Sequence, residues 1–153
     1  MRLPFFVFLF PVRLVALGCL FLLCFPRAAW GQTDLSGKWV GTISLRDEVF
    51  SFEMDLGQQG DRIAGRSYVT VEDIYATMDL VGELHSGILF RFQETRILDY
   101  TEHEGMEWCI KKGQLLLKKE PDQWILEGYW QGYTSFSECT PGKVVLKKVV
   151  PRA

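Results

Sequence analysis

The sequence predicts an all-β protein: an eight-stranded antiparallel up-and-down barrel that follows an N-terminal signal peptide. Apolar and polar residues alternate with a period of two through most of the chain after residue 34, as in strands with one buried face. Short polar turns separate these stretches, and no long segment repeats with the period of a helix. Because a meander of this kind avoids open sheet edges by closing on itself, a barrel is favoured over an open sandwich.

Residues 1–31 have the layout of a secretory signal peptide. A short basic start precedes an unbroken apolar run at residues 14–25, and Ala29 and Gly31 supply the small residues at which such a segment is cleaved. Cleavage leaves residues 32–153 as a single domain, long enough for one core and too short for two. We therefore expect a secreted or periplasmic protein that is not inserted in a membrane after cleavage.

Two other interpretations of the N-terminal segment are open. The apolar stretch is long enough to anchor the chain in a bilayer, but Arg13 lies in its middle. Cys19 follows small residues as a lipidated cysteine does, but the apolar run continues beyond it. Both interpretations are disfavoured relative to cleavage.

The charge and the cysteine content of the domain limit the kinds of molecule that it is expected to bind. All acidic residues lie in 32–153, whereas three arginines leave with the signal, so the domain is more acidic than the net charge of −2 of the whole chain. An acidic domain has no electrostatic reason to bind nucleic acid or an anionic membrane. Its two cysteines, Cys109 and Cys139, are predicted to form a disulfide, because exported compartments are oxidising. Neither has another His or Cys close by, so no metal and no cofactor are predicted.

The first strand covers residues 35–46. Its expected inner face consists of Leu35, Gly37, Trp39, Gly41, Ile43 and Leu45. Four further strands follow the same alternation, at residues 50–56, 63–71, 76–84 and 88–95, and an acidic loop is expected at residues 99–105. The alternation resumes at residues 106–110, residues 111–114 are interpreted as a hairpin, and residues 115–117 follow. After a turn at residues 120–123 come a strand at 124–132, a loop at 133–142 that carries Cys139, and a last strand at 143–150.

Gly37-Lys38-Trp39, near the expected mature N-terminus, resembles the Gly-x-Trp signature of the calycin superfamily, which includes lipocalins and avidins. The resemblance implies a lipocalin-like barrel of a small exported bacterial kind, in which Gly37 and Trp39 form the barrel floor. It also implies a basic side chain from the last strand above the tryptophan, with Lys147, Lys148 and Arg152 as candidates. The chain is too short for the helix that follows a lipocalin barrel, so avidin-like proportions fit better.

Glu94 and Arg96 continue the inward positions of Phe90 and Phe92, and are therefore expected near one end of the interior. Buried charges are costly unless they are paired. Three interpretations are open: an ion pair at the rim, an anchor for the polar head of a ligand, and a bulge that turns both residues to water.

Aromatic residues crowd the expected inner faces. A barrel of eight strands either fills its interior with side chains or holds one small ligand. In the second case Phe90, Phe92, Trp108, Trp124 and Trp130 would line the pocket, with Glu94 and Arg96 near its mouth. Outward apolar residues would form a dimer or partner surface on the outer wall if they are contiguous: Val40, Tyr68, Val81, Leu89, Ile125 and Tyr129.

No catalytic residue is predicted. His85 is expected in a turn and His103 in the acidic loop, and the sequence contexts of nucleophilic triads, phosphate loops and zinc helices are absent. An enzyme that uses Glu94 or His103 is the least favoured alternative. We expect a non-enzymatic barrel that binds a small apolar or amphiphilic ligand. The second hypothesis is a protein–protein interaction module with a filled core, which acts through its wall or through residues 99–107.

Overall fold

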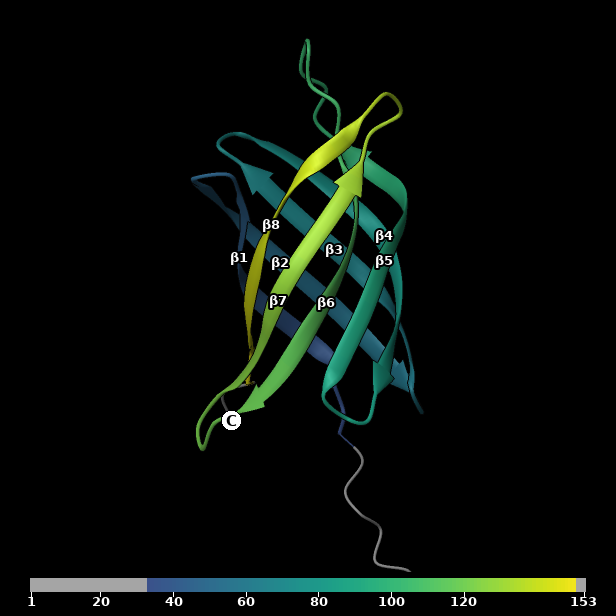
Figure 1. Cartoon of the computed structure of the whole chain (residues 1–153), viewed down its shortest axis with the longest axis vertical. Coiled ribbons are helices and arrows are strands. Elements are labelled where there is room, and N and C mark those ends of the chain that lie inside the picture. Colours follow the sequence, from purple (N-terminus) through teal and green to yellow (C-terminus); the bar gives the residue numbers. More distant parts are fainter. Residues whose placement is uncertain (1–32, 151–153) are drawn as a thin grey trace, which may run out of the picture. The chain divides into compact units, whose positions relative to one another are not determined.

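A computed structural model describes residues 33–150 of the chain as a closed barrel. The predicted signal peptide at residues 1–31 and the candidate Arg152 lie outside the described residues. The barrel has eight strands (Figure 1). They are β1 (Gly37–Leu45), β2 (Glu48–Gln59), β3 (Arg62–Val71), β4 (Ile74–His85), β5 (Leu89–Tyr100), β6 (Ile110–Lys119), β7 (Trp124–Tyr133) and β8 (Glu138–Lys148).

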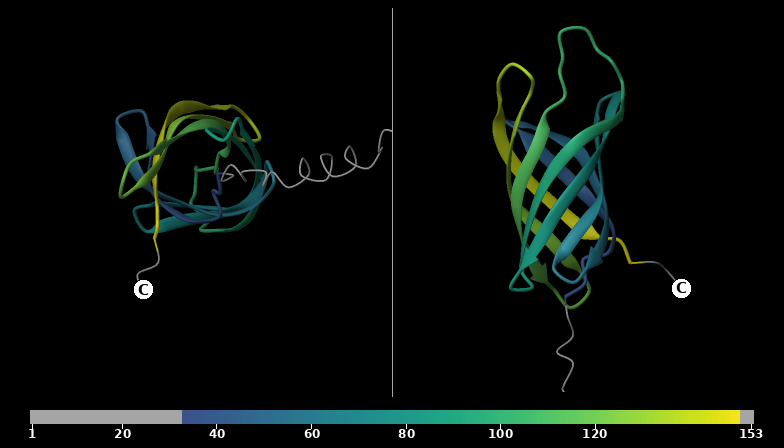
Figure 2. Two further views of the ribbon diagram at one scale, coloured as in Figure 1. Left: turned by 90° about the horizontal axis from the view of Figure 1, so that it is seen from below. Right: turned by 90° about the vertical axis from the view of Figure 1, so that its right-hand side faces the viewer.

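Each strand pairs in antiparallel fashion with the next strand in the chain, and β8 pairs with β1 to close the ring. Viewed along its axis, the barrel is a complete circle of strands (Figure 2). The predicted eight-stranded antiparallel up-and-down barrel is therefore confirmed, and the open sandwich is wrong. Residues 33–150 contain no helix of the length and apolarity needed to cross a membrane.

The inward side chains form one core. Every strand contributes buried residues at inward positions to one apolar cluster, and Trp39, Phe52 and Phe90 are fully inaccessible to solvent. Burial of a large apolar side chain contributes about 1.5–3 kcal/mol. Burial of these inward side chains, which the alternation in the sequence places together, thus contributes to the stability of the barrel.

Trp39 and Lys148 close one end of the barrel. The indole N–H of Trp39 donates to the carbonyl of Leu35, 2.8 Å away, so the segment before β1 folds across this end. The ammonium of Lys148, from the last strand, lies 5.7 Å from the centre of the Trp39 ring and donates to the carbonyl of Asp34. Of the three candidates for a basic cover over the tryptophan, Lys148 has this position.

Several predicted boundaries in the second half of the chain are wrong. Residues 111–114 are not a hairpin: they lie inside β6, whereas residues 106–109 belong to no strand. The error arises because Lys111 and Gly113 occupy inward positions of β6, which hides the alternation continued by Leu115. β8 begins at Glu138, so Cys139 lies in a strand instead of a loop.

Inward glycines let the wall approach the core. A Cβ atom added to Gly82 would lie 2.6 Å from the ring of Phe90, and one added to Gly113 would lie 2.6 Å from the ring of Phe92. Real Cβ atoms do not come so close, so only glycine fits at either position. The phenylalanine rings take the space that the two missing side chains leave.

Candidate functional site

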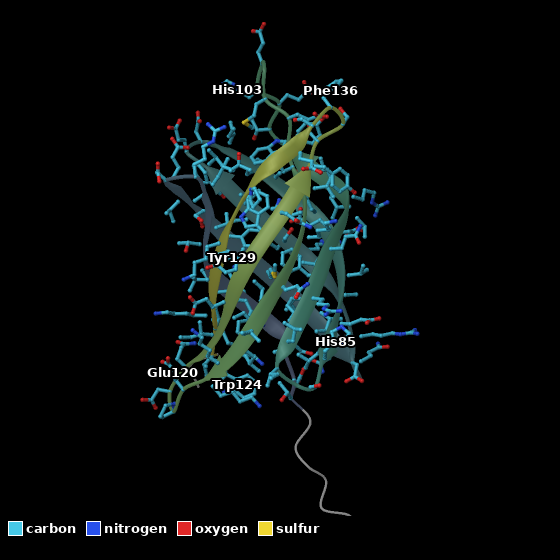
Figure 3. The ribbon with its side chains drawn as sticks, in the orientation of Figure 1. His85, His103, Glu120, Trp124, Tyr129 and Phe136 are labelled. Atoms are coloured by element: carbon cyan, nitrogen blue, oxygen red, sulfur yellow. A yellow bond between two sulfur atoms is a disulfide. The ribbon has the colours of Figure 1, made fainter. Side chains whose placement is uncertain are left out.

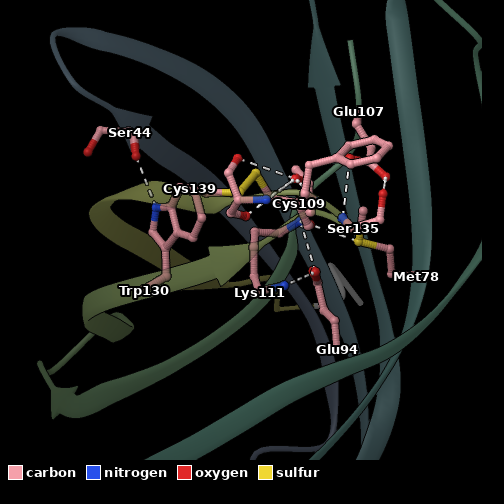
Figure 4. Close-up of a disulfide and its surroundings, with 12 residues drawn as sticks. Ser44, Met78, Glu94, Glu107, Cys109, Lys111, Trp130, Ser135 and Cys139 are labelled. Carbon is pink, nitrogen blue, oxygen red and sulfur yellow. Dashed lines mark hydrogen bonds and ion pairs between the residues drawn. A yellow bond between two sulfur atoms is a disulfide. The ribbon is translucent and has the colours of Figure 1, made fainter.

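An ion pair is enclosed in the barrel interior near the end opposite Trp39. The ammonium of Lys111 in β6 lies 2.9 Å from the carboxylate of Glu94 in β5, and the two side chains are 4% and 0% exposed (Figure 4). Glu94 therefore points inward, as its position in the strand predicts. Its partner is Lys111, which the sequence pattern did not single out.

The remaining hydrogen-bonding groups of the pair are also satisfied. The hydroxyl of Ser67 donates to one Glu94 oxygen at 2.6 Å, and the backbone N–H of Lys111 donates to the other at 2.8 Å. The Lys111 ammonium also contacts the carbonyl of Cys109 at 3.1 Å and the sulfur of Met78 at 3.3 Å. Among the described residues, no buried side-chain nitrogen or oxygen lacks a partner. The network is complete without any bound molecule.

Arg96 does not share this environment. Its side chain is 70% exposed and its guanidinium lies 2.7 Å from Asp79 on the outside of the wall. The pairing of β4 with β5 shifts between Asp79 and Leu80, so Thr95 has no opposite residue in β4 and the following residue changes face. The prediction that Arg96 points inward with Glu94 is wrong, and so is the prediction of a rim ion pair between them.

The predicted aromatic lining is brought together only in part: Phe92 and Trp130 border the same concave surface, whereas Trp108 and Trp124 do not. Phe90 and Phe92 are buried in the interior, and Trp130 is buried with its indole N–H on the carbonyl of Ser44, 3.0 Å away. Trp108 lies in the β5–β6 connection and is partly buried. Trp124 lies at the end of the barrel that Trp39 and Lys148 close (Figure 3), and the ammonium of Lys148 is 5.0 Å from the centre of its ring. The three tryptophans therefore do not line a common pocket.

We call the end of the barrel opposite Trp39 the mouth. A disulfide and side-chain hydrogen bonds link its chain segments to one another. The predicted disulfide between Cys109 and Cys139 is confirmed, with Cα atoms 6.5 Å apart (Figure 4). It joins the β5–β6 connection to β8. Nearby, Glu107 accepts hydrogen bonds from the hydroxyl and the backbone N–H of Ser135, at 2.5 and 3.2 Å. The hydroxyl of Ser135 holds the pKa of Glu107 below its usual value.

Phe136 stands at the tip of the β7–β8 connection and is 91% exposed (Figure 3). The turn beneath it is ordered by Thr134, whose backbone N–H donates to the carbonyl of Ser137 at 2.8 Å. The Thr134 hydroxyl accepts the backbone N–H groups of Phe136 and Ser137 at 3.3 and 3.1 Å. The turn thus holds the Phe136 ring in a solvent-exposed position.

Three of the four connections at the mouth, β1–β2, β3–β4 and β5–β6, are acidic, whereas the β7–β8 connection that bears Phe136 has no acidic residue. They carry Asp47, Glu72, Asp73, Glu102, Glu104 and Glu107. Within the described chain, Arg46 is the single lysine or arginine on the same four connections. A partner that covers the mouth would therefore meet a negative surface.

The two histidines lie far apart. His103 belongs to the mouth and contacts the backbone carbonyl of Glu104, whereas His85 lies near the opposite end beside Glu83 (Figure 3). Residues 33–150 contain no group of three or more His, Cys, Asp or Glu side chains that could hold a metal ion.

The barrel has two concave surfaces. One borders the disulfide at the mouth, and the other crosses the wall from β2 to β8, where its lining includes the inward residues Ile63, Phe92 and Trp130. The fold defines the protein as a closed up-and-down β-barrel compatible with the calycin type. Comparison of the chain with family models, with curated proteins and with solved structures gives no match.

Sequence reasoning missed Lys111 and Phe136 as residues of interest. Lys111 was hidden because two lysines before a glycine resemble a turn. Counting back in steps of two from Leu117 and Leu115 through Gly113 places it inward. The exposure of Phe136 had no signal in the sequence, because alternation does not extend into a connection.

Proposed function

We propose that the protein is an exported, non-enzymatic interaction module that binds a protein partner at its mouth. The observation that carries this proposal is that the buried polar groups of the barrel interior already have partners within the protein. Its core is one cluster of apolar side chains, and its buried charges, Glu94 and Lys111, pair with each other. A ligand with a polar head would have to break this pair, which leaves a buried charge without a partner and costs about 3–5 kcal/mol.

The mouth has the features of a binding surface. An almost fully exposed aromatic ring on an ordered turn offers a large apolar area at little cost in conformational entropy. The disulfide ties the β5–β6 connection to β8, and the Glu107–Ser135 hydrogen bonds tie it to the connection that carries Phe136. Because the other connections at the mouth carry acidic side chains, the partner would present an apolar pocket with lysine or arginine at its rim.

The predicted small apolar ligand stays a prediction, and one experiment separates it from this proposal. Purified residues 32–153 would be heated in the presence of fatty acids, haem-like compounds and small aromatics, with tryptophan emission recorded. We expect no change in Tm and no quenching. A ligand held in the interior must raise Tm by mass action, so a saturable rise would overturn the packed-core proposal.

A second experiment tests the mouth directly. Peptides selected from a displayed library on the immobilised protein are expected to combine aliphatic or aromatic residues with flanking lysine or arginine. Phe136→Ser should weaken their binding by roughly tenfold or more, as loss of a central anchor does. Tyr129→Ser is the matched control, because it removes a ring that is 71% exposed on the wall. Equal losses from both variants, or selection of acidic peptides, would contradict the proposal.

A further inference from the structure

The second concave surface, on the outer wall, has a chemistry unlike that of the mouth. Five outward residues follow one another across hydrogen-bonded strands from β3 to β7: Arg62, Glu83, Arg91, Gln114 and Tyr129. All five are exposed and line the same groove. With about 4.8 Å between neighbouring strands, the four steps of this row span about 19 Å. Tyr129 stands in the middle of the wall in Figure 3.

A second row runs beside the first, two residues further along each strand. Gln93 in β5, Lys112 in β6 and Gln131 in β7 are paired neighbours and also line the groove. The inward residues between the two rows include Gly82 and Gly113. Because these glycines let the wall sink toward the phenylalanine rings, the outer surface is hollowed along the rows.

The positive side chains of this groove lack acidic partners. Arg62, Arg91 and Lys112 form no ion pair or side-chain hydrogen bond with another residue of the described chain. Several cations elsewhere on the wall do have such partners, namely Lys38 with Glu53, Arg66 and Arg96 with Asp79, and Lys118 and Lys143 with Glu127, whereas Lys147 has none within the described residues. Against these three cations the groove has one carboxylate, Glu83, which contacts His85, so its net charge is positive on a domain that is acidic as a whole.

The side-chain amides of the groove also lack hydrogen-bond partners within the described residues. Gln93, Gln114 and Gln131 make no hydrogen bond through their side chains within residues 33–150. Each amide can donate and accept at once, which suits the hydroxyl groups of a sugar. Tyr129 adds an exposed ring face and a hydroxyl beside them.

We infer that this groove binds a linear acidic polysaccharide, of the class built from uronic acid units. The guanidinium groups of Arg62 and Arg91 and the ammonium of Lys112 would contact its carboxylates, the glutamine amides its hydroxyls, and Tyr129 the face of a sugar ring. An acidic peptide is disfavoured, because the closed barrel offers no free strand edge to a peptide backbone. This site differs in place and in charge from the mouth.

The test uses polygalacturonate as the probe and uncharged dextran as its neutral counterpart, with binding to residues 32–153 measured by calorimetry at low and high salt. We expect binding of polygalacturonate that weakens with salt, and none of dextran. Arg91→Gln with Lys112→Gln should reduce the affinity by roughly tenfold or more. Tyr129→Ser should reduce it further without changing the salt dependence.

The matched control is Arg46→Gln with Lys147→Gln, which removes the same two charges from positions outside the groove. If this control weakens binding as much as the groove variant, the attraction is a property of net charge and the site is refuted. Absence of polygalacturonate binding, or equal binding of dextran, also refutes it. Phe136→Ser should leave polysaccharide binding unchanged, so failure at the mouth and failure at the groove are distinguishable.

Discussion

Lys111 and Glu94 face each other across neighbouring strands inside the barrel, with 2.9 Å between ammonium and carboxylate, and both side chains are buried. Taking two charges out of water is costly, and their attraction offsets this cost only where the remaining hydrogen bonds are also made. Here Ser67 and the backbone N–H of Lys111 make them. The pair thus fixes the alignment of β5 with β6 beneath the mouth.

Removal of one partner should be strongly destabilising. Lys111→Met leaves the Glu94 carboxylate buried with two neutral donors, so the free energy of unfolding should fall by about 3–5 kcal/mol. Urea denaturation followed by tryptophan emission measures this loss. A change below about 1 kcal/mol would mean that water reaches the carboxylate in solution.

The double variant Lys111→Met with Glu94→Gln is the control for this prediction. The amide introduced in place of the carboxylate would be neutral, its oxygen would accept the backbone N–H of residue 111, and its NH₂ group would donate to Ser67. We expect most of the lost stability to return, since neither buried charge remains. If the double variant is as unstable as the single one, lost packing and not the unpaired charge is responsible.

The alternation of side chains was enough to predict the barrel but not its exact strand limits. Inward positions such as Trp39, Phe52 and Phe90 are apolar, so a period of two identifies their strands directly. Alternation fails where the interior holds a charge. Lys111 looks like a turn residue in the sequence because its partner, Glu94, lies 17 residues away and becomes its neighbour only through strand pairing.

Arg96 illustrates a second limit. Whether it lies inside or outside depends on the extra residue at Thr95, and a bulge of one residue has no reliable signature in the sequence. The wall and residues 99–107 were expected as alternative interaction surfaces, but the residues that share the groove could not be grouped from the sequence. Arg62, Arg91 and Tyr129 are distant in the sequence, and only the pairing of β3 through β7 brings them into one row.

The disulfide should stabilise the barrel and hold the mouth. In the chain-entropy model, a link between cysteines 30 residues apart contributes about 3–4 kcal/mol to the free energy of unfolding. Cys109→Ser with Cys139→Ser should therefore lower the urea midpoint, and hydrogen exchange should rise at residues 101–109. Binding at the mouth should weaken while polysaccharide binding persists. An unchanged midpoint would show that the connections are held by their polar contacts alone.

Lys148 should contribute more to the stability of the barrel than Lys147, the residue before it. Lys148→Met keeps an apolar stem above Trp39 but removes the hydrogen bond to Asp34 and the positive charge over two indole rings, a loss of about 1–2 kcal/mol. Lys147→Met removes the same charge from an exposed outward position one residue earlier. Thermal unfolding and tryptophan emission should change for Lys148→Met and stay constant for Lys147→Met. Equal effects would contradict a specific role for the cover.

Stability in acid should depend on Glu127, which lies on the outer wall between Lys118 and Lys143. Hydrogen bonds from these two lysines lower the pKa of Glu127 to about 2 from its usual 4.5. Because the folded pKa is lower than the unfolded one, this contribution is complete above pH 4.5 and disappears as the pH falls towards about 2.

Glu127→Gln should therefore flatten the dependence of Tm on pH across that window, with the largest difference from the natural chain near neutral pH and at low salt. The effect should be small, since the carboxylate and both lysines are exposed to solvent screening. Glu48→Gln removes an exposed carboxylate that has no ion pair within residues 33–150 and serves as the control. If both variants shift the acid profile alike, repulsion from net charge governs it, and the two lysines have no specific effect.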